Sequence, residues 1–519
     1  MNDTAVSPLS PGASSSQDGG QFFLWASVLT LICVAVGKFA SSRVSKGRPN
    51  LPDGPVGLPI VGSFPFLTHY PELILDKWAK TFGDLYSVWL GNQLFVIVSS
   101  PDVAKDLMVT NGSVFSSRKE MFIKSQTVFV GRGITATPYN DRWRKHRRIA
   151  GNWLHTKAVD GYTYVLDREA TDMVACLYKA SNNGTSLVNP QPFAGRCSLN
   201  NMLTIAFGTR TNSIHDPMEL HWTRVQLDRF VPLLQALPSR LKSRAQKLNQ
   251  DLVSTYGGII QDINRRLRLG QPVPDCLSKN MLSIKDAEQL DDLDMAILTS
   301  AFMIGGVETT ASIMQWFSAL IPAYPEIQKR AQEELDCVVG RDRLPGVEDE
   351  KNLPYCHAII KEIERCHNPF WLGTPHVSTA DFVYRGRLIP KDTVLVLNTW
   401  TMHHDEERFP DPMTFNPERY LHDSLSSADS SNLADPNKRD NWMFGAGRRI
   451  CPSMWVAERE IWLTVSRMLW AFNMEAAPGH SVDLKEYDGL SGRSPVPFHI
   501  YLKPRHENVA KVLEAAVHV

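Results

Sequence analysis

Residues 444–453 read Phe444-Gly445-Ala446-Gly447-Arg448-Arg449-Ile450-Cys451-Pro452-Ser453. The stretch brings one cysteine to the start of a predicted helix that runs from Cys451 to about Phe472, and Pro452 suits the first helical position. The helix dipole and two neighbouring arginines favour thiolate, the metal-binding form, over thiol. Glycines let a flat group approach the backbone. The pattern predicts a low-pKa cysteine beside an anionic partner, and the alternative is a buried structural cysteine.

The stretch resembles the haem-binding signature of the cytochromes P-450, F-x-x-G-x-R-x-C-x-G. It matches at Phe444, Gly447, Arg449 and Cys451, and departs at Ser453, where the family usually has glycine. The resemblance implies that Cys451 is the axial thiolate ligand of the iron of haem b, and that the other three matching residues bind the cofactor.

A second motif interrupts the apolar run 295–316 with Gly305-Gly306-Val307-Glu308-Thr309. Glycine weakens a helix, so either another element packs closely here or the helix opens a groove over a ligand. The motif is similar to the oxygen-binding groove of the family. By that resemblance Thr309 hydrogen-bonds dioxygen and Glu308 helps to relay protons.

Two further motifs carry charge. Glu362 and Arg365 lie three apart on one helical face, where an ion pair is common and weak. They resemble the family's E-x-x-R, and Arg419 in Phe415–Tyr420 resembles its partner. The resemblance implies a structural triad behind the haem.

Trp143 and Arg147 share one face of another predicted helix, and resemble the family's W-x-x-x-R, which binds a haem propionate. His376 matches a position that often contacts a propionate. The alternative for the basic helix is a charged surface exposed to solvent. The alternative for His376 is a polar residue that makes its hydrogen bonds within the protein and has no functional role.

Alignment with the family predicts the substrate pocket. Its walls would come from the Phe122–Val130 loop, Phe302, Gly306, Phe370, Trp371, Leu372 and Leu490. These side chains are mostly aromatic or aliphatic, so we expect a small hydrophobic substrate. Asn368 and Trp371 stand where the family often has prolines.

The composition excludes some classes of function. The 519 residues contain 55 Lys plus Arg and 55 Asp plus Glu, so the net charge is zero and nucleic acid is not an expected partner. The 8 scattered cysteines indicate reduced thiols.

The N-terminus predicts a membrane anchor. Residues 1–20 read as a disordered lumenal tail, 21–40 as a transmembrane helix, 41–63 as a basic, proline-rich hinge, and 64–519 as the haem-thiolate domain. The basic flank after the helix predicts a single-pass protein of the endoplasmic reticulum membrane with a cytosolic catalytic domain. A cleaved signal peptide is the alternative.

The pattern along the rest of the chain predicts a mainly α fold with a minor β-sheet. We expect a hairpin at 84–90 and 93–99, helices at 252–269, 292–320 and 325–339, strands within 377–398, and a mobile insertion at 421–440.

The resemblance implies a monooxygenase that uses O2 and electrons from NADPH-cytochrome P-450 reductase. The reductase would dock on Arg144–Arg148 with Lys438, Arg439 and Arg448. It further implies a tailoring step on a polyketide, terpenoid or alkaloid. Alternatives are a haem-thiolate isomerase or peroxygenase that needs no reductase, and a non-catalytic haem-binding protein.

Overall fold

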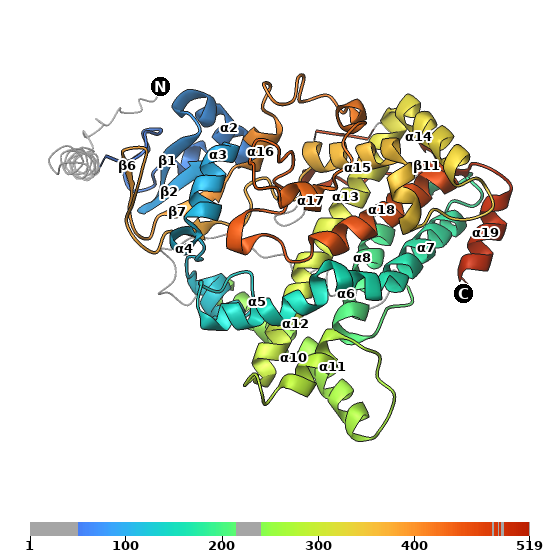
Figure 1. Cartoon of the computed structure of the whole chain (residues 1–519), viewed down its shortest axis with the longest axis horizontal. Coiled ribbons are helices and arrows are strands. Elements are labelled where there is room, and N and C mark those ends of the chain that lie inside the picture. The colour runs from blue at the N-terminus through green and yellow to red at the C-terminus, as the bar shows by residue number, and fades with distance from the viewer. Residues whose placement is uncertain (1–49, 214–239, 480–481, 486, 489–492, 518–519) are drawn as a thin grey trace, which may run out of the picture.

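The computed structural model describes residues 50–517, apart from 214–239, 480–481, 486 and 489–492. Helices form most of the molecule, and the largest sheet lies at the end where the described chain begins (Figure 1). The predicted class, mainly α with small sheets, is confirmed. The predicted tail and anchor, and Leu490, lie outside the described residues.

Helices occupy most of the predicted positions. The longer ones are α2 (Pro71–Phe82), α5 (Asp141–Leu154), α7 (Thr163–Ala180), α8 (Gln191–Phe207), α10 (Arg240–Arg268), α11 (Leu277–Ile284), α12 (Asp292–Gly306), α13 (Glu308–Leu320), α14 (Pro325–Val338), α15 (Pro354–Cys366), α18 (Met454–Ala471) and α19 (Asn508–Val517). Short segments are η1 (Phe64–Phe66), α3 (Pro101–Ala104), η2 (Lys105–Thr110), α4 (Gly112–Phe115), η3 (Phe122–Val128), α6 (Thr156–Gly161), η5 (Ile321–Ala323), η6 (Val347–Asn352), α16 (Thr399–His403), η7 (Pro417–Tyr420), α17 (Ser427–Ser431) and η8 (Gly447–Arg449).

The main sheet has the strand order β1-β2-β7-β4. Its strands are β1 (Leu85–Leu90), β2 (Gln93–Val98), β7 (Val394–Leu397) and β4 (His376–Val377). β1 and β2 form the predicted antiparallel hairpin, and β7 lies parallel to β2. The smaller sheets contain β3 (Leu187–Val188), β11 (Ile500–Pro504) and β8 (Phe472–Ala476); β5 (Phe382–Tyr384) and β6 (Arg387–Ile389); and β9 (Tyr487–Asp488) and β10 (Ser494–Pro495).

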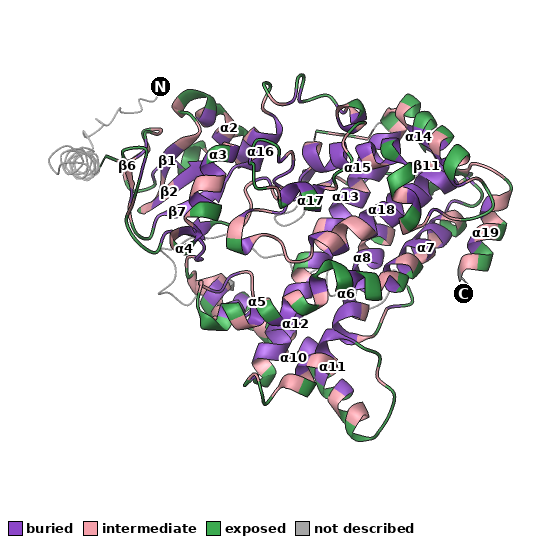
Figure 2. Cartoon of the chain, viewed as in Figure 1, coloured by how far each residue is buried: buried purple, intermediate pink, exposed green. Residues whose placement is uncertain are grey.

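The core lies among the helices α7, α8, α12, α13 and α18, whose ribbons are largely buried (Figure 2). Within the described part of the chain, one helical run, Asp292–Ala323, is long and apolar enough to cross a membrane, and 78% of its most apolar window is buried in protein. An all-round apolar helix of this kind is the central helix of a large core.

Two local expectations are wrong. Helix α18 begins at Met454 and not at Cys451, because Pro452 and Ser453 form a turn. The dipole argument for Cys451 weakens accordingly, since the effect is confined to the first turn. The segment 421–440 is not a mobile insertion: α17 buries Ser427 and Ala428, and Lys361 Nζ lies 2.7 Å from a carboxylate oxygen of Asp440.

Candidate functional site

Cys451 lies in a loop whose shape depends on the preceding motif residues. Its N–H donates to the carbonyl of Phe444 at 2.8 Å, and Phe444 packs in a small apolar cluster with Met454. Gly447 has a φ of 65°, and a Cβ there would lie 2.0 Å from the carbonyl oxygen of Met108. Only glycine fits such a position. The loop therefore fixes the backbone of a half-buried cysteine.

Three arginine side chains gather beside this loop. Arg449 donates to the carbonyl oxygens of Ser116 at 2.8 Å and Thr137 at 2.6 Å. Arg118 donates to the carbonyl of Pro375 at 2.9 Å. Arg147, on α5, donates to the carbonyl of Ile450, next to Cys451. These three guanidinium groups come from separate parts of the chain.

The gathered cations have no carboxylate partner among the described residues. Burial lowers the pKa of Arg118, Arg147 and Arg449, and repulsion from Arg147 lowers it further for the other two. Burial, followed by repulsion from Arg118, also lowers the pKa of Lys124 on η3. Guanidinium groups remain charged in proteins, so the cluster costs free energy until an anion binds. The two propionates of haem b fit that requirement.

Trp143 and His376 border the same cluster. The indole Nε1 of Trp143 donates to the carbonyl of Ile134 at 3.0 Å, and Arg449 donates to the same oxygen. The ring nitrogen Nδ1 of His376 lies 2.7 Å from the carbonyl of Phe115. Burial, then Arg118, lowers the pKa of His376 well below its usual value, so its ring is neutral. The structure thus brings together the residues predicted to bind propionate.

The glycine pair of the central helix has two separate roles. A Cβ on Gly306 would lie 2.2 Å from the sulfur of Met202, so this glycine lets α8 pack closely. Gly305 is exposed, whereas Gly306 beside it is buried, and the carbonyl of Gly305 accepts a 2.7 Å hydrogen bond from the hydroxyl of Thr309. The helix breaks at Val307, between α12 and α13. One open, polar face remains at Gly305, Glu308 and Thr309.

Most of the side chains predicted to line the substrate pocket pack against other side chains of the protein. Trp371 lies 4.7 Å from Trp400 between ring centroids, against α16. Leu372 packs on the main sheet, and Phe302 belongs to the main core. The buried contacts of Trp371 do not support a pocket role for this side chain, whereas the role of the half-buried Leu372 stays a prediction. Phe370 is half-buried, as is Phe122 at the start of η3.

The three charged residues predicted to form a triad do meet. Arg365 binds both carboxylate oxygens of Glu362 at 2.7 Å, and Arg419 Nε lies 3.3 Å from the same carboxylate. Glu362 and Arg365 are each 0% exposed. Burial opposes the charge of Arg365, but the hydrogen bonds to Glu362 raise its pKa overall. Arg365 also donates to the carbonyls of His403 and Pro412, so the triad fastens the segment after α16.

Sequence reasoning missed Arg118 and Lys124. Neither belongs to one of the recognised motifs, and only the chain's path through space brings Arg118 beside Arg147 and Arg449, and Lys124 beside Arg118. It also misassigned Arg439 to a docking face. Arg439 is 3% exposed and donates to the carbonyl of Asn441 at 2.9 Å.

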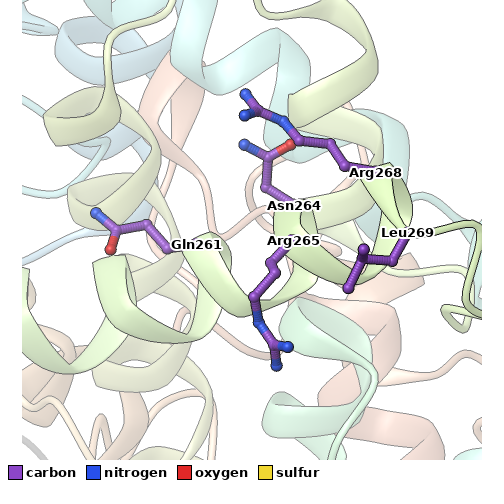
Figure 3. A pocket seen from close by; sticks show the side chains of 5 residues that line it. All are labelled: Gln261, Asn264, Arg265, Arg268 and Leu269. Carbon is purple, nitrogen blue, oxygen red and sulfur yellow. The ribbon is translucent and has the colours of Figure 1, made fainter.

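A surface hollow on α10 has no relation to these motifs. It is lined by Gln261, Asn264, Arg265, Arg268 and Leu269 (Figure 3). All five residues come from the last turns of one helix and its end, and Arg265 is paired with Asp262 of the same helix.

Comparison with known proteins agrees with the geometry. The family model "Cytochrome P-450" matches residues 52–501. The cytochrome P-450 monooxygenase virE of Hypocrea virens is 31% identical over 494 residues, covering 90% of this chain and 88% of that protein. The cytochrome P-450 monooxygenase polD of Polytolypa hystricis is 32% identical, covering 93% of this chain and 96% of that protein.

The fold also matches that of solved cytochrome P-450 structures. A zebra fish cytochrome P-450 structure with abiraterone superposes with a TM-score of 0.71 at 23% identity, covering 84% of this chain and 99% of that chain. From its family match and its fungal relatives, this chain belongs to the cytochrome P-450 family and is an oxidoreductase of the monooxygenase type.

Proposed function

We propose that this enzyme inserts one oxygen atom from O2 into a small hydrophobic molecule in a tailoring step of secondary metabolism. The observation that carries the proposal is the cluster of buried and half-buried arginines beside the Cys451 loop, which has no carboxylate partner among the residues that the structure describes. Cys451 and this cluster would hold haem b, the cluster through the propionates, and the bound haem would supply the activation of O2.

The residues of this chain have distinct tasks in that reaction. Arg118, Arg147 and Arg449 would orient and neutralise the propionates. The indole of Trp143, which lies under the guanidinium of Arg449, would hold that arginine in place. Thr309 presents its hydroxyl at the open face of the central helix, where it holds a proton for delivery. Glu308 lies at the same break in the helix and connects that face to a proton source.

Electrons would come from NADPH-cytochrome P-450 reductase. The basic face predicted for docking is smaller than its sequence indicates, because Arg439 is buried and Arg148 pairs with Glu288 at 2.6 Å. Lys438 and Arg448 are exposed. We propose these two as the principal charges that face an acidic partner.

We further propose attachment to the endoplasmic reticulum membrane through residues 21–40, with the catalytic domain in the cytosol. Exposed apolar residues follow that segment: Val56 is 88%, Ile60 76% and Phe64 46% exposed. Side chains of this kind at the base of an anchor favour contact with the bilayer. Deletion of residues 1–40 tests the anchor: the protein should bind the membrane fraction more weakly and keep its haem, and unchanged membrane binding would contradict the anchor.

Reconstitution tests the reaction itself. With NADPH, reductase and candidate hydrophobic substrates, we expect oxygenated product that carries one atom of labelled O2. The protein with Cys451→Ala should lose both product and the red-shifted Soret band of the reduced carbon-monoxide complex. Product formed from peroxide alone, with no increase on adding reductase, would instead identify a peroxygenase.

A further inference from the structure

The hydroxyl of Ser453 points at the sulfur of Cys451. The two atoms, Oγ and Sγ, lie 3.5 Å apart. Ser453 occupies the position where the family motif usually has glycine, so the hydroxyl is a feature of this chain. Ser453 therefore places a polar group against the predicted iron ligand, which a glycine at this position could not do.

The direction of the Ser453 hydroxyl is informative because the backbone N–H groups of the first turn of α18 are an alternative partner for it. Ser453 is the N-cap residue of α18, and serine there normally accepts a hydrogen bond from the first turn of the helix. Here its side chain makes no such capping bond. Within the described residues, the contact with the Cys451 sulfur is the one hydrogen bond of this hydroxyl.

The direction of this hydrogen bond follows from the charge on sulfur. A thiol could donate to the serine oxygen, but a thiolate has no proton and can only accept. When Cys451 binds iron as thiolate, the Ser453 hydroxyl is therefore the donor. Hydrogen bonds to an ionised acceptor are stronger than neutral ones.

We infer that Ser453 is a positioning residue that tunes the thiolate ligand through this hydrogen bond. Groups around a metal set its properties through the ligand they touch. A donor on the sulfur withdraws electron density from it, and hydrogen bonding to the ligand is one of the means by which a protein adjusts a haem potential. The hydroxyl should weaken donation from Cys451 and make the iron easier to reduce. This inference rests on the proposed haem-thiolate function.

Three substitutions test it on the full-length holoprotein. Ser453→Ala and Ser453→Gly remove the donor, and Ser453→Thr retains it. In the first two, we expect a lower midpoint potential, a stronger iron–sulfur bond by resonance Raman spectroscopy, and a changed Soret position of the reduced carbon-monoxide complex. A threefold change in the one-electron equilibrium corresponds to about 28 mV, at about 59 mV per decade. Ser453→Thr should resemble the unsubstituted protein.

The glycine variant keeps the test decisive, because the family motif tolerates glycine at this position and the variant should bind haem even if the alanine variant does not. An unchanged potential and iron–sulfur frequency in haem-loaded Ser453→Gly would overturn the role of the hydroxyl. Absence of the thiolate-type Soret band in the unsubstituted protein would instead contradict the haem-thiolate function itself.

Discussion

Arg449 lies over the indole of Trp143, with 4.1 Å between the guanidinium carbon and the ring centroid. Both side chains donate to the carbonyl oxygen of Ile134. The contact joins the loop before Cys451 to helix α5. A cation over an aromatic face is stabilised, but the guanidinium of Arg449 has no carboxylate partner in the part of the chain that the structure describes.

Replacing Arg449 with Met should affect haem binding more than the stability of the apoprotein. Removal of the buried, unneutralised charge ends its desolvation cost, but the carbonyl oxygens of Ser116 and Thr137 lose their donor, so the melting temperature of the apoprotein should change little. Loss of a propionate contact should weaken haem binding about 10-fold or more. Differential scanning calorimetry and haem titration measure the two effects. Arg448→Gln, at the exposed neighbouring position, is the matched control. It should leave both the melting temperature of the apoprotein and the haem affinity close to those of the unsubstituted protein.

Breaking the pair of Glu362 and Arg365 should destabilise the protein severely. Glu362→Ala or Arg365→Ala leaves an uncompensated buried charge, at a cost of about 3–5 kcal/mol. The yield of haem-loaded protein checks this. The control is Arg330→Ala, because Arg330 and Glu418 pair at the surface with side chains 47% and 45% exposed, where a pair contributes about 1 kcal/mol or less. Equal yields for the buried and exposed variants would contradict the prediction.

Thr309→Ala should uncouple electron use from product formation. The hydroxyl bound to the Gly305 carbonyl is lost, so proton delivery at the open helix face becomes less controlled while folding and haem content stay normal. We expect more peroxide and less product per NADPH. Thr309→Ser, which keeps the hydroxyl, should remain close to the unsubstituted enzyme. The same product yield per NADPH in Thr309→Ala would remove Thr309 from the mechanism.

Two carboxyl groups with raised pKa values, on the buried Glu364 and the half-buried Glu458, should make stability fall as pH rises. Burial, with repulsion from Glu364, raises the pKa of Glu458 to about 8, and burial raises that of Glu364 to about 7. The folded state therefore binds more protons than the unfolded state above the usual glutamate pKa, so stability is lost as pH rises through these folded pKa values. Between pH 6 and 8, the free energy of unfolding should fall by roughly 1–3 kcal/mol less in Glu458→Gln than in the unsubstituted protein. Melting temperatures across that range measure it, and an unchanged pH slope would refute it.

Trp371→Ala should lower stability without changing the product. The ring packs on Trp400 and His404, and truncation of a buried tryptophan costs about 3–5 kcal/mol. Phe370→Ala at the half-buried neighbouring position is the comparison, and it should change substrate affinity or the position oxidised. The two variants are compared by melting temperature and product analysis. A new product from Trp371→Ala would return this residue to the pocket wall.

The sequence by itself determined the family, the helical character and the residues of the four motifs. Those features depend on local patterns: the glycine and cysteine spacing near Cys451, the long apolar run of α12 and α13, and the three-residue spacing of Glu362 and Arg365. Adjacent residues in a motif stay adjacent in space, so a match to a pattern is enough to find them.

Only the tertiary structure decided which residues share an environment across long separations. Arg118 joins Arg147 and Arg449 because three distant segments converge, and Trp371 turns toward α16 because the chain after α15 packs on that side. Gly306 faces Met202 while the adjacent Gly305 stays open, since successive helical residues point in different directions. Long-range contacts determine how far a residue is buried, which way its side chain points and which charges lie near it. No local sequence pattern encodes those contacts.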